Sequence, residues 1–76
     1  MLLGNKIGRK IVRIRRERDL SQEDLAHRCN VSQAWINKIE VGKSIPSIKF
    51  LYVLSKNLNC DVFDLIPTIE EVKNYV

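Results

Sequence analysis

Histidine and cysteine are scarce in this chain of 76 residues, which contains one histidine and two cysteines. Cys29 and Cys60 are not spaced as a CxxC pair and have no histidine nearby in the sequence, so we expect no metal site. His27 has no serine, carboxylate or second histidine arranged with it for catalysis, and we expect it at the surface. A glycine-rich phosphate loop is also missing. The sequence therefore gives no support for an enzyme, a metal or another cofactor.

Long apolar runs are missing as well. No run approaches the roughly 20 residues that a membrane-spanning helix needs, and residues 1–4 lack the basic end and apolar stretch of a signal peptide. We therefore expect a cytoplasmic protein with no membrane partner. In that compartment Cys29 is expected as a small core residue and Cys60 as partly exposed, although the sequence alone also allows a disulfide between them.

Acidic residues are sparse in the first part of the chain. Residues 1–49 contain eleven Lys or Arg against five Asp or Glu, whereas residues 50–76 contain two against four. The formal net charge of +4 is thus the sum of +6 in the first segment and −2 in the second. A cationic segment suits a polyanionic partner such as a nucleic acid, although an ordinary solvated basic surface would have the same composition.

Apolar spacing predicts an all-α fold of five helices, with a short sixth helix as an option at the C-terminal end. The first helix has an apolar stripe of Ile7, Ile11 and Ile14. Serine or aspartate precedes each of the next four helices and can cap it, and Thr68 with Glu71 forms a capping-box pattern before the sixth. The predicted helices span residues 5–18, 22–29, 33–41, 48–58, 62–66 and 70–75.

The fourth predicted helix is amphipathic. We expect one group of its side chains to face the core, with Leu54 and Leu58 flanking that group. The core-facing residues are Ile48, Leu51, Tyr52 and Ser55.

The second and third predicted helices are joined by a tight turn. Asn30 occupies the turn, where a left-handed backbone is needed and asparagine tolerates it. The third helix would expose amide groups, one methyl group and one cation, which are the groups that contact base edges in a major groove. These exposed residues are Gln33, Ala34, Asn37 and Lys38. Together the two helices indicate a helix-turn-helix that binds double-stranded DNA.

The same residues resemble the Cro/repressor, or Xre-like, helix-turn-helix family. The resemblance covers about residues 5–66 and implies a compact five-helix, lambda-repressor-like domain over residues 1–66, with the motif at about 21–41. The sequence departs from the family pattern at Asn30, where glycine is commonest, and at Trp35, a large residue beside the exposed face. The matching segments are Leu20-Ser-Gln-x-x-Leu-Ala26, Val31-Ser-x-x-x-Ile36, Ile39-Glu40-x-Gly42-Lys43 and Pro46.

Base contacts are expected from the recognition helix, residues 33–41. Gln33 can bond adenine through its amide, Ala34 can contact a thymine methyl, and Lys38 can donate to guanine. Asn37 could contact either a base or a phosphate. The resemblance implies that Gln22 bonds a phosphate and also braces Gln33.

Further contacts to the DNA backbone are expected around the motif. Trp35 has two interpretations, packing at the edge of the core or donating its indole NH to a phosphate. The other expected backbone contacts are Ser32, Lys43, Ser44 and Lys49.

Arg15 and Glu40 lie beside the apolar stripes of the first and third helices. The resemblance implies that they form a partly buried ion pair that fixes the angle of the recognition helix. Two unrelated surface charges are the alternative.

Apolar residues are concentrated after Asn59. We expect a homodimer interface here, with residues 67–76 as a tail in contact with a second copy, or else a tail that folds back and completes the core. The expected interface residues are Phe63, Leu65, Ile66, Val72 and Tyr75.

The sequence favours a transcriptional regulator that acts as a homodimer on a palindromic operator, with no small-molecule ligand. The antitoxin of a toxin–antitoxin pair, whose main partner is a protein, is the alternative. A domain used only for protein interaction is a third reading, and the polar face at Gln33 and Lys38 argues against it.

Overall fold

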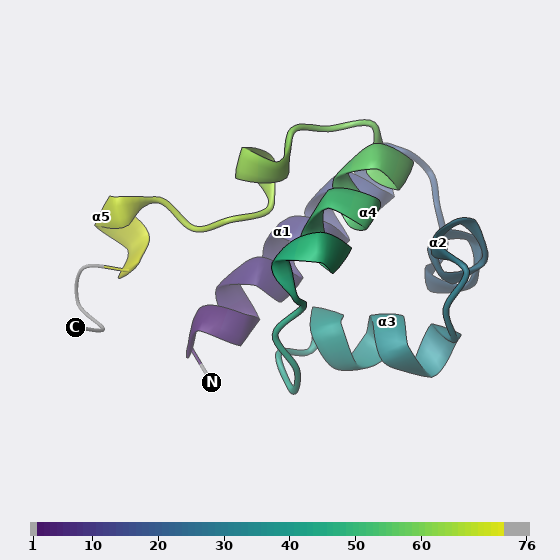
Figure 1. Ribbon diagram of the computed structural model, residues 1–76, viewed down its shortest axis with the longest axis horizontal. Coiled ribbons are helices and arrows are strands. Elements are labelled where there is room, and N and C mark those ends of the chain that lie inside the picture. Colours follow the sequence, from purple (N-terminus) through teal and green to yellow (C-terminus); the bar gives the residue numbers. More distant parts are fainter. Residues whose placement is uncertain (1, 73–76) are drawn as a thin grey trace.

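A computed structural model describes residues 2–72, which form helices and no strand (Figure 1). The all-α prediction is thereby confirmed. α1 packs against α3, α2 packs against both α3 and α4, and α5 lies at the end of the molecule opposite α2. The elements are α1 (Leu2–Glu17), α2 (Gln22–Cys29), α3 (Gln33–Glu40), α4 (Ile48–Leu58), the 3₁₀ turn η1 (Val62–Asp64) and α5 (Ile69–Val72).

Helix boundaries follow the prediction closely in the middle of the chain. α2 and α4 match it, and α3 ends one residue early because Val41 is its C-cap. α1 begins three residues earlier than predicted, and Leu3 packs against the core there and extends the apolar stripe by one turn. Within residues 2–72 no helix is long and apolar enough to cross a membrane, since α1, the longest, has 16 residues.

The C-terminal segment differs more from the prediction. The fifth helix, predicted over residues 62–66, is only the single 3₁₀ turn η1, because too few residues separate the Asp61 cap from Pro67 for a regular α-helix. The capping box before α5 is present, with the Glu71 amide donating to Thr68 Oγ1 at 3.2 Å. Of the predicted helix at residues 70–75, positions 73–75 lie outside the described residues.

The predicted capping residues hold the helix starts. The hydroxyl of each serine cap accepts a hydrogen bond from the amide three residues further on, at 2.9 Å for Ser21 and 3.1 Å for Ser32 and Ser47. Asn30 has a left-handed backbone (φ 58°, ψ 44°), as predicted. Its amide donates to the end of α2, which lets the chain turn sharply into α3. The local sequence therefore fixes the helix-turn-helix geometry.

The core lies between α1, α2, α3 and α4. On α4, Leu54 and Leu58 are fully buried, whereas Ile48 and Tyr52 are 75% and 59% exposed. The expectation that Ile48 and Tyr52 face the core is wrong, because the buried face of α4 is centred on its leucines. The buried apolar residues are Ile7, Ile11, Ile14, Leu25, Ala26, Cys29, Ile36, Ile39, Leu51, Leu54, Leu58 and Leu65.

Two glycines set how α1 meets the end of α3. A Cβ atom on Gly8 would overlap the backbone carbonyl of Glu40, so only glycine permits this close approach. Gly42, which follows the C-cap of α3, has a φ of +84°, a backbone conformation that favours glycine. The N-terminal half of α1 therefore lies directly against the C-terminal end of α3.

Candidate nucleic-acid interface

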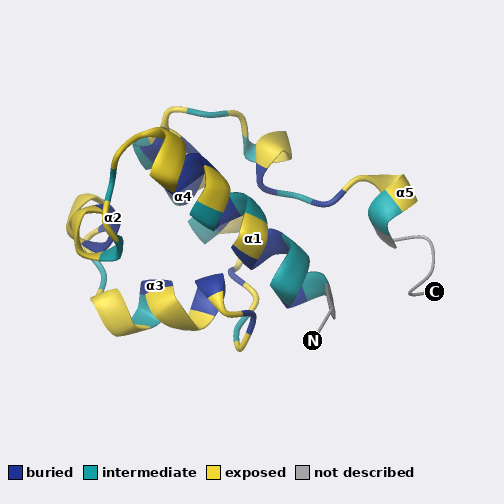
Figure 2. Cartoon of the chain, turned by 180° about the vertical axis from the view of Figure 1, so that it is seen from behind, coloured by how far each residue is buried: buried dark blue, intermediate teal, exposed yellow. Residues whose placement is uncertain are grey.

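α3 presents two faces of different character. Ile36 and Ile39 are each 1% exposed and anchor the helix on the core. Figure 2 shows α3 at the edge of the molecule with exposed and buried residues alternating along it. The four residues predicted to contact bases are all exposed, and they share the outer face: Gln33, Ala34, Asn37 and Lys38. Amide, methyl and ammonium groups are thus presented together on one helix.

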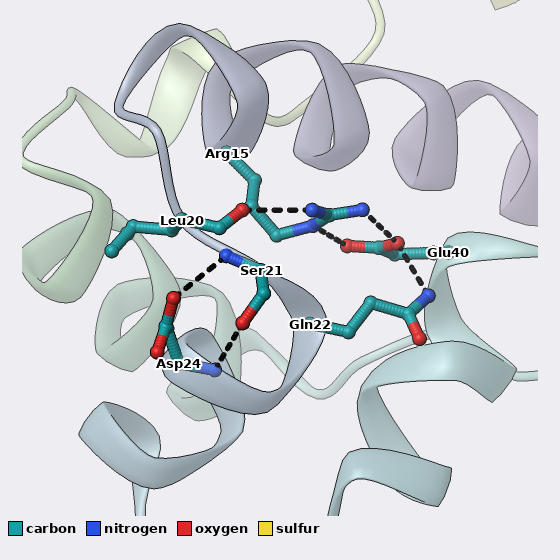
Figure 3. A network of polar contacts seen from close by, with 6 residues as sticks. All are labelled: Arg15, Leu20, Ser21, Gln22, Asp24 and Glu40. Atoms are coloured by element: carbon teal, nitrogen blue, oxygen red, sulfur yellow. Dashed lines mark hydrogen bonds and ion pairs between the residues drawn. The ribbon is translucent and has the colours of Figure 1, made fainter.

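Arg15 and Glu40 form the predicted buried ion pair (Figure 3). Arg15 Nε donates to Glu40 Oε2 at 2.7 Å, and Nη2 donates to Oε1 at 3.0 Å. The third guanidinium nitrogen, Nη1, donates to the carbonyl oxygen of Leu20 at 2.8 Å. The two side chains are only 10% and 3% exposed. This pair joins α1 to the last turn of α3 and to the segment that leads into α2.

Gln22 belongs to the same network. Its Nε2 donates to Glu40 Oε1 at 2.8 Å, so the side chain braces Glu40 rather than Gln33 (Figure 3). The expected bond between Gln22 and Gln33 is therefore replaced by one that reaches the other end of α3. Gln22 is half-buried at the start of α2, and its contact with a phosphate stays a prediction.

The loop after α3 folds back onto the recognition helix. The amides of Lys43 and Ser44 both donate to the carbonyl oxygen of Lys38, at 2.9 and 3.3 Å. Because these amides are occupied, only the two side chains can serve the predicted phosphate contacts. Lys43 is exposed, Ser44 is half-buried, and Lys49 is exposed in the first turn of α4.

Trp35 and Ser32 have structural partners of their own. Trp35 is half-buried and packs against the core, which agrees with the first of its two interpretations. Ser32 is exposed, but its hydroxyl already accepts the Trp35 amide as the α3 cap. Their contacts with DNA phosphates stay predictions.

Asp24 places a negative charge beside Gln22 at the start of α2. The backbone amide of Ser21 donates to Asp24 Oδ2 at 3.0 Å. This bond, followed by one with the Ser21 hydroxyl, holds the pKa of the Asp24 carboxyl below its ordinary value of 3.8. The carboxylate therefore already occupies part of the positive end of the α2 dipole that a phosphate would use.

The cysteines and the histidine lie where the sequence placed them. Cys29 is buried, Cys60 is half-buried, and His27 is exposed. Both thiols are free, and burial raises the pKa of each. Within residues 2–72 no group of histidine, cysteine and carboxylate side chains is suited to a metal ion.

The residues expected at a dimer interface do not share one environment. Leu65 is fully buried in the core of its own chain, so its place on an exposed interface is corrected. Phe63 is 77% exposed and Ile66 is half-buried. The side chain of Val72 and all of Tyr75 lie outside the described residues. The chain therefore enters the core at Leu65 and leaves Phe63 outside.

Sequence reasoning missed the role of Arg18. Its Nε donates to the carbonyl oxygen of Leu58 at 3.0 Å, and Nη2 donates to that of Asn59 at 3.2 Å. A guanidinium thus closes the C-terminal end of α4, where unpaired carbonyls favour a cation. Asn59, with a φ of 53°, is the signal that α4 ends there, but nothing in the sequence pointed to Arg18 as the partner.

Known proteins are similar to this chain in sequence. The helix-turn-helix family matches residues 11–65, more than half of the chain. The HTH-type transcriptional regulator y4dJ of Sinorhizobium fredii is 31% identical over 65 residues, which are 86% of this chain and 84% of that protein. The ImmF control region 10 kDa protein of Bacillus phage phi105 is 34% identical over 62 residues, 82% of this chain and 69% of that protein.

A protein of known structure is similar to this chain in both sequence and fold. The wild-type restriction-modification controller protein C.Esp1396I is 31% identical to this chain, with a TM-score of 0.79. The match covers 95% of this chain and 94% of the controller protein. This chain therefore belongs to the helix-turn-helix family of DNA-binding transcriptional regulators, which are not enzymes.

Proposed function

We propose that this protein regulates transcription in the cytoplasm by binding a palindromic operator as a homodimer, with α3 in the major groove of each half-site. The observation that carries the proposal is the exposed polar face of α3, whose far end is held by the Arg15–Glu40–Gln22 network. Side chains that read base edges must be held in register with the groove. The ion pair with Arg15 on α1 and the hydrogen bond from the side-chain amide of Gln22 on α2 supply that constraint.

In this proposal the base contacts come from Gln33, Ala34, Asn37 and Lys38. Gln33 stands at the first turn of α3, the end that enters a major groove in helix-turn-helix complexes. The exposed side chains of Lys43 and Lys49 lie after α3 and would set the position of the duplex through its phosphates. The residues divide accordingly into one group that sets sequence preference and another that sets salt dependence.

The small size of one reading unit supports the homodimer. A single recognition helix contacts few base pairs, so two copies on half-sites about 34 Å apart would bind far more tightly than one. Large apolar side chains are left exposed on the monomer, which suits a second copy. We place the contact at the C-terminal segment, through Phe63, Ile66 and the tail of residues 67–76. The similarity to a restriction-modification controller supports regulation by such a small unit.

Selection of bound sequences from random duplexes, followed by footprinting and sedimentation equilibrium, tests the proposal. We expect an enriched sequence with two-fold symmetry, protection of both half-sites and a mass of two chains. A monomer at micromolar concentration that binds half-site and palindrome alike would overturn the homodimer. A stable complex with the product of a neighbouring gene, without any preference among duplexes, would instead favour the antitoxin alternative.

A further inference from the structure

α1 carries a row of three exposed arginines, Arg9, Arg13 and Arg16. Their spacing of four and three residues places them along one side of the helix, over about 10 Å at 1.5 Å per residue. They lie around a shallow concavity next to the last residue of α3. The residues that line it are Arg9, Val12, Arg13, Arg16, Glu17 and Glu40.

The fold does not use these three arginines. Three other cations of the same region have partners, since Arg15 bonds Glu40, Lys10 bonds Glu71 at 3.1 Å and Arg18 bonds the end of α4. By contrast, none of the row forms a hydrogen bond or an ion pair within residues 2–72. Among the described residues that line the concavity, two are carboxylates, and Glu40 is already neutralised by Arg15, which leaves Glu17.

The row lies on the helix that packs directly against the end of the recognition helix. Gly8 allows α1 to approach the backbone of Glu40 closely, and the Glu40 side chain accepts a hydrogen bond from Gln22 at the start of α2. The row therefore lies next to Glu40, which bonds Gln22, the residue for which the sequence predicts a phosphate contact. A DNA strand held at Gln22 and running along this edge of the motif would reach the arginines next.

We propose that Arg9, Arg13 and Arg16 form a second phosphate-binding surface, which extends the contact with the bound duplex beyond the helix-turn-helix. This inference rests on the proposed function. It adds α1 to the DNA footprint and predicts that much of the affinity is independent of sequence, because phosphate contacts carry no base information.

An acidic protein segment is the other polyanion that such a row could bind, and the surface suits it less. Protein interfaces usually centre on buried apolar or aromatic anchors. Of the described residues that line this concavity, Val12 is the one with an apolar side chain, and it is half-buried. Guanidinium groups in a row match the regular spacing and paired oxygens of phosphates.

The test measures the affinity for a short labelled duplex of arbitrary sequence between about 50 and 200 mM salt. The variant Arg9→Gln/Arg16→Gln removes two charges from the row. Arg28→Gln/Lys56→Gln removes the same charge from exposed sites on α2 and α4 and serves as the matched control. Arg9→Lys/Arg16→Lys keeps the charge, and circular dichroism verifies that all variants stay helical.

We expect the plot of log affinity against log salt to become less steep by about 1.8 for the row variant, since each phosphate contact contributes about 0.9. The control and lysine variants should keep the parent slope. A row variant with the parent slope would overturn the inference alone, whereas a parent that binds no duplex would overturn the proposed function as well. Loss of binding to a polyglutamate peptide, with the DNA slope unchanged, would assign the row to an acidic protein and also overturn the inference.

Discussion

Arg15 on α1 and Glu40 on α3 form an ion pair in which all three guanidinium nitrogens of Arg15 have an oxygen partner. Glu40 Oε1 accepts from Gln22 as well, so the first turn of α2 is tied to the last turn of α3. Within the described residues no buried side-chain polar atom lacks a partner. The orientation of the recognition helix therefore depends on a largely buried polar network in which every buried side-chain polar atom has a partner.

Removal of one partner of the Arg15–Glu40 ion pair should lower the free energy of unfolding far more than replacement of both. Glu40→Ala strands the Arg15 guanidinium in a buried site, and we expect a loss of about 3–5 kcal/mol in the free energy of unfolding. Arg15→Met combined with Glu40→Leu replaces the pair with apolar groups and should recover much of that loss. Urea unfolding of the single and double variants measures the coupling between the two sites.

The same double variant separates stability from orientation. If the ion pair sets the angle of α3, the stabilised variant should fold and still bind its operator less well than the parent. A coupling energy near zero would contradict the pair, and full operator affinity in the double variant would contradict its orienting role.

Gln33 and Lys38 should control sequence preference. We expect Gln33→Ala and Lys38→Ala each to lose about 1–3 kcal/mol of discrimination between operator and scrambled duplex, because each removes a base contact. Lys43→Ala is the matched control, because the loss of a phosphate contact should weaken binding to both duplexes equally. Anisotropy titrations at one fixed salt concentration provide the comparison. Equal losses on both duplexes for Gln33→Ala and Lys38→Ala would show that these residues are not base readers.

Gly8→Ala should destabilise the fold. In an open helix this change is favourable by up to about 1 kcal/mol, but here the new methyl meets the Glu40 carbonyl and must push α1 away from α3. We expect a net loss of about 1–3 kcal/mol, as for other overpacked sites. Thermal unfolding gives the sign directly. A more stable Gly8→Ala variant would contradict the close approach of the two helices.

Asp24 should stabilise the protein in a pH-dependent manner. Its pKa is lowered in the folded state, chiefly by the Ser21 amide, so its contribution is present above the ordinary value of 3.8 and is lost as the pH falls through the lowered value. Asp24→Asn keeps the shape of the side chain and removes the charge. Its stability deficit should shrink below about pH 4 and vanish in stronger acid.

Glu23→Gln is the control for this effect, because it removes a charge from the same turn outside the capping box. Urea midpoints across the acid range measure both variants. A deficit for Asp24→Asn that does not change with pH, or one no larger than that of Glu23→Gln, would contradict the role of the capping box.

The fold and much of the candidate site could be predicted where the local sequence is decisive. The serine caps, Asn30 and Gly42 fix helix ends through their own backbone chemistry, so α2 and the turn after it match the prediction and α3 differs from it by one residue. The positions of Ile36, Ile39 and Glu40 on one face then place the polar residues of α3 on the other.

Tertiary contacts decided the features that were mispredicted. Ile48 and Tyr52 continue an apolar pattern on α4, but no helix of the described chain covers that side. Leu65 follows the single 3₁₀ turn η1, which Pro67 prevents from continuing as a regular helix. Helical periodicity therefore does not predict which way the Leu65 side chain points, and only the folded chain shows that it enters the core. The Gln22–Glu40 bond joins residues 18 positions apart, beyond any local pattern.

Leu65 and Phe63 are two residues apart, but truncation of their side chains should affect the free energy of unfolding very differently. Leu65 is fully buried, so Leu65→Ala should lower the free energy of unfolding by about 2–5 kcal/mol. Phe63 is 77% exposed, so Phe63→Ala should change the stability of the dilute monomer by less than about 0.5 kcal/mol. If Phe63 lies at the proposed homodimer contact, the same change should weaken dimerisation.

Sedimentation equilibrium and operator binding distinguish these effects, with stability measured at low protein concentration because dimerisation adds to apparent stability. Phe63→Ala should bind a palindrome much more weakly than the parent and a single half-site equally well, since only the palindrome benefits from two linked copies. Tyr52→Ala removes an exposed aromatic side chain from α4 and is the matched control. A dimer that is lost in Tyr52→Ala and retained in Phe63→Ala would move the interface from the C-terminal segment to α4.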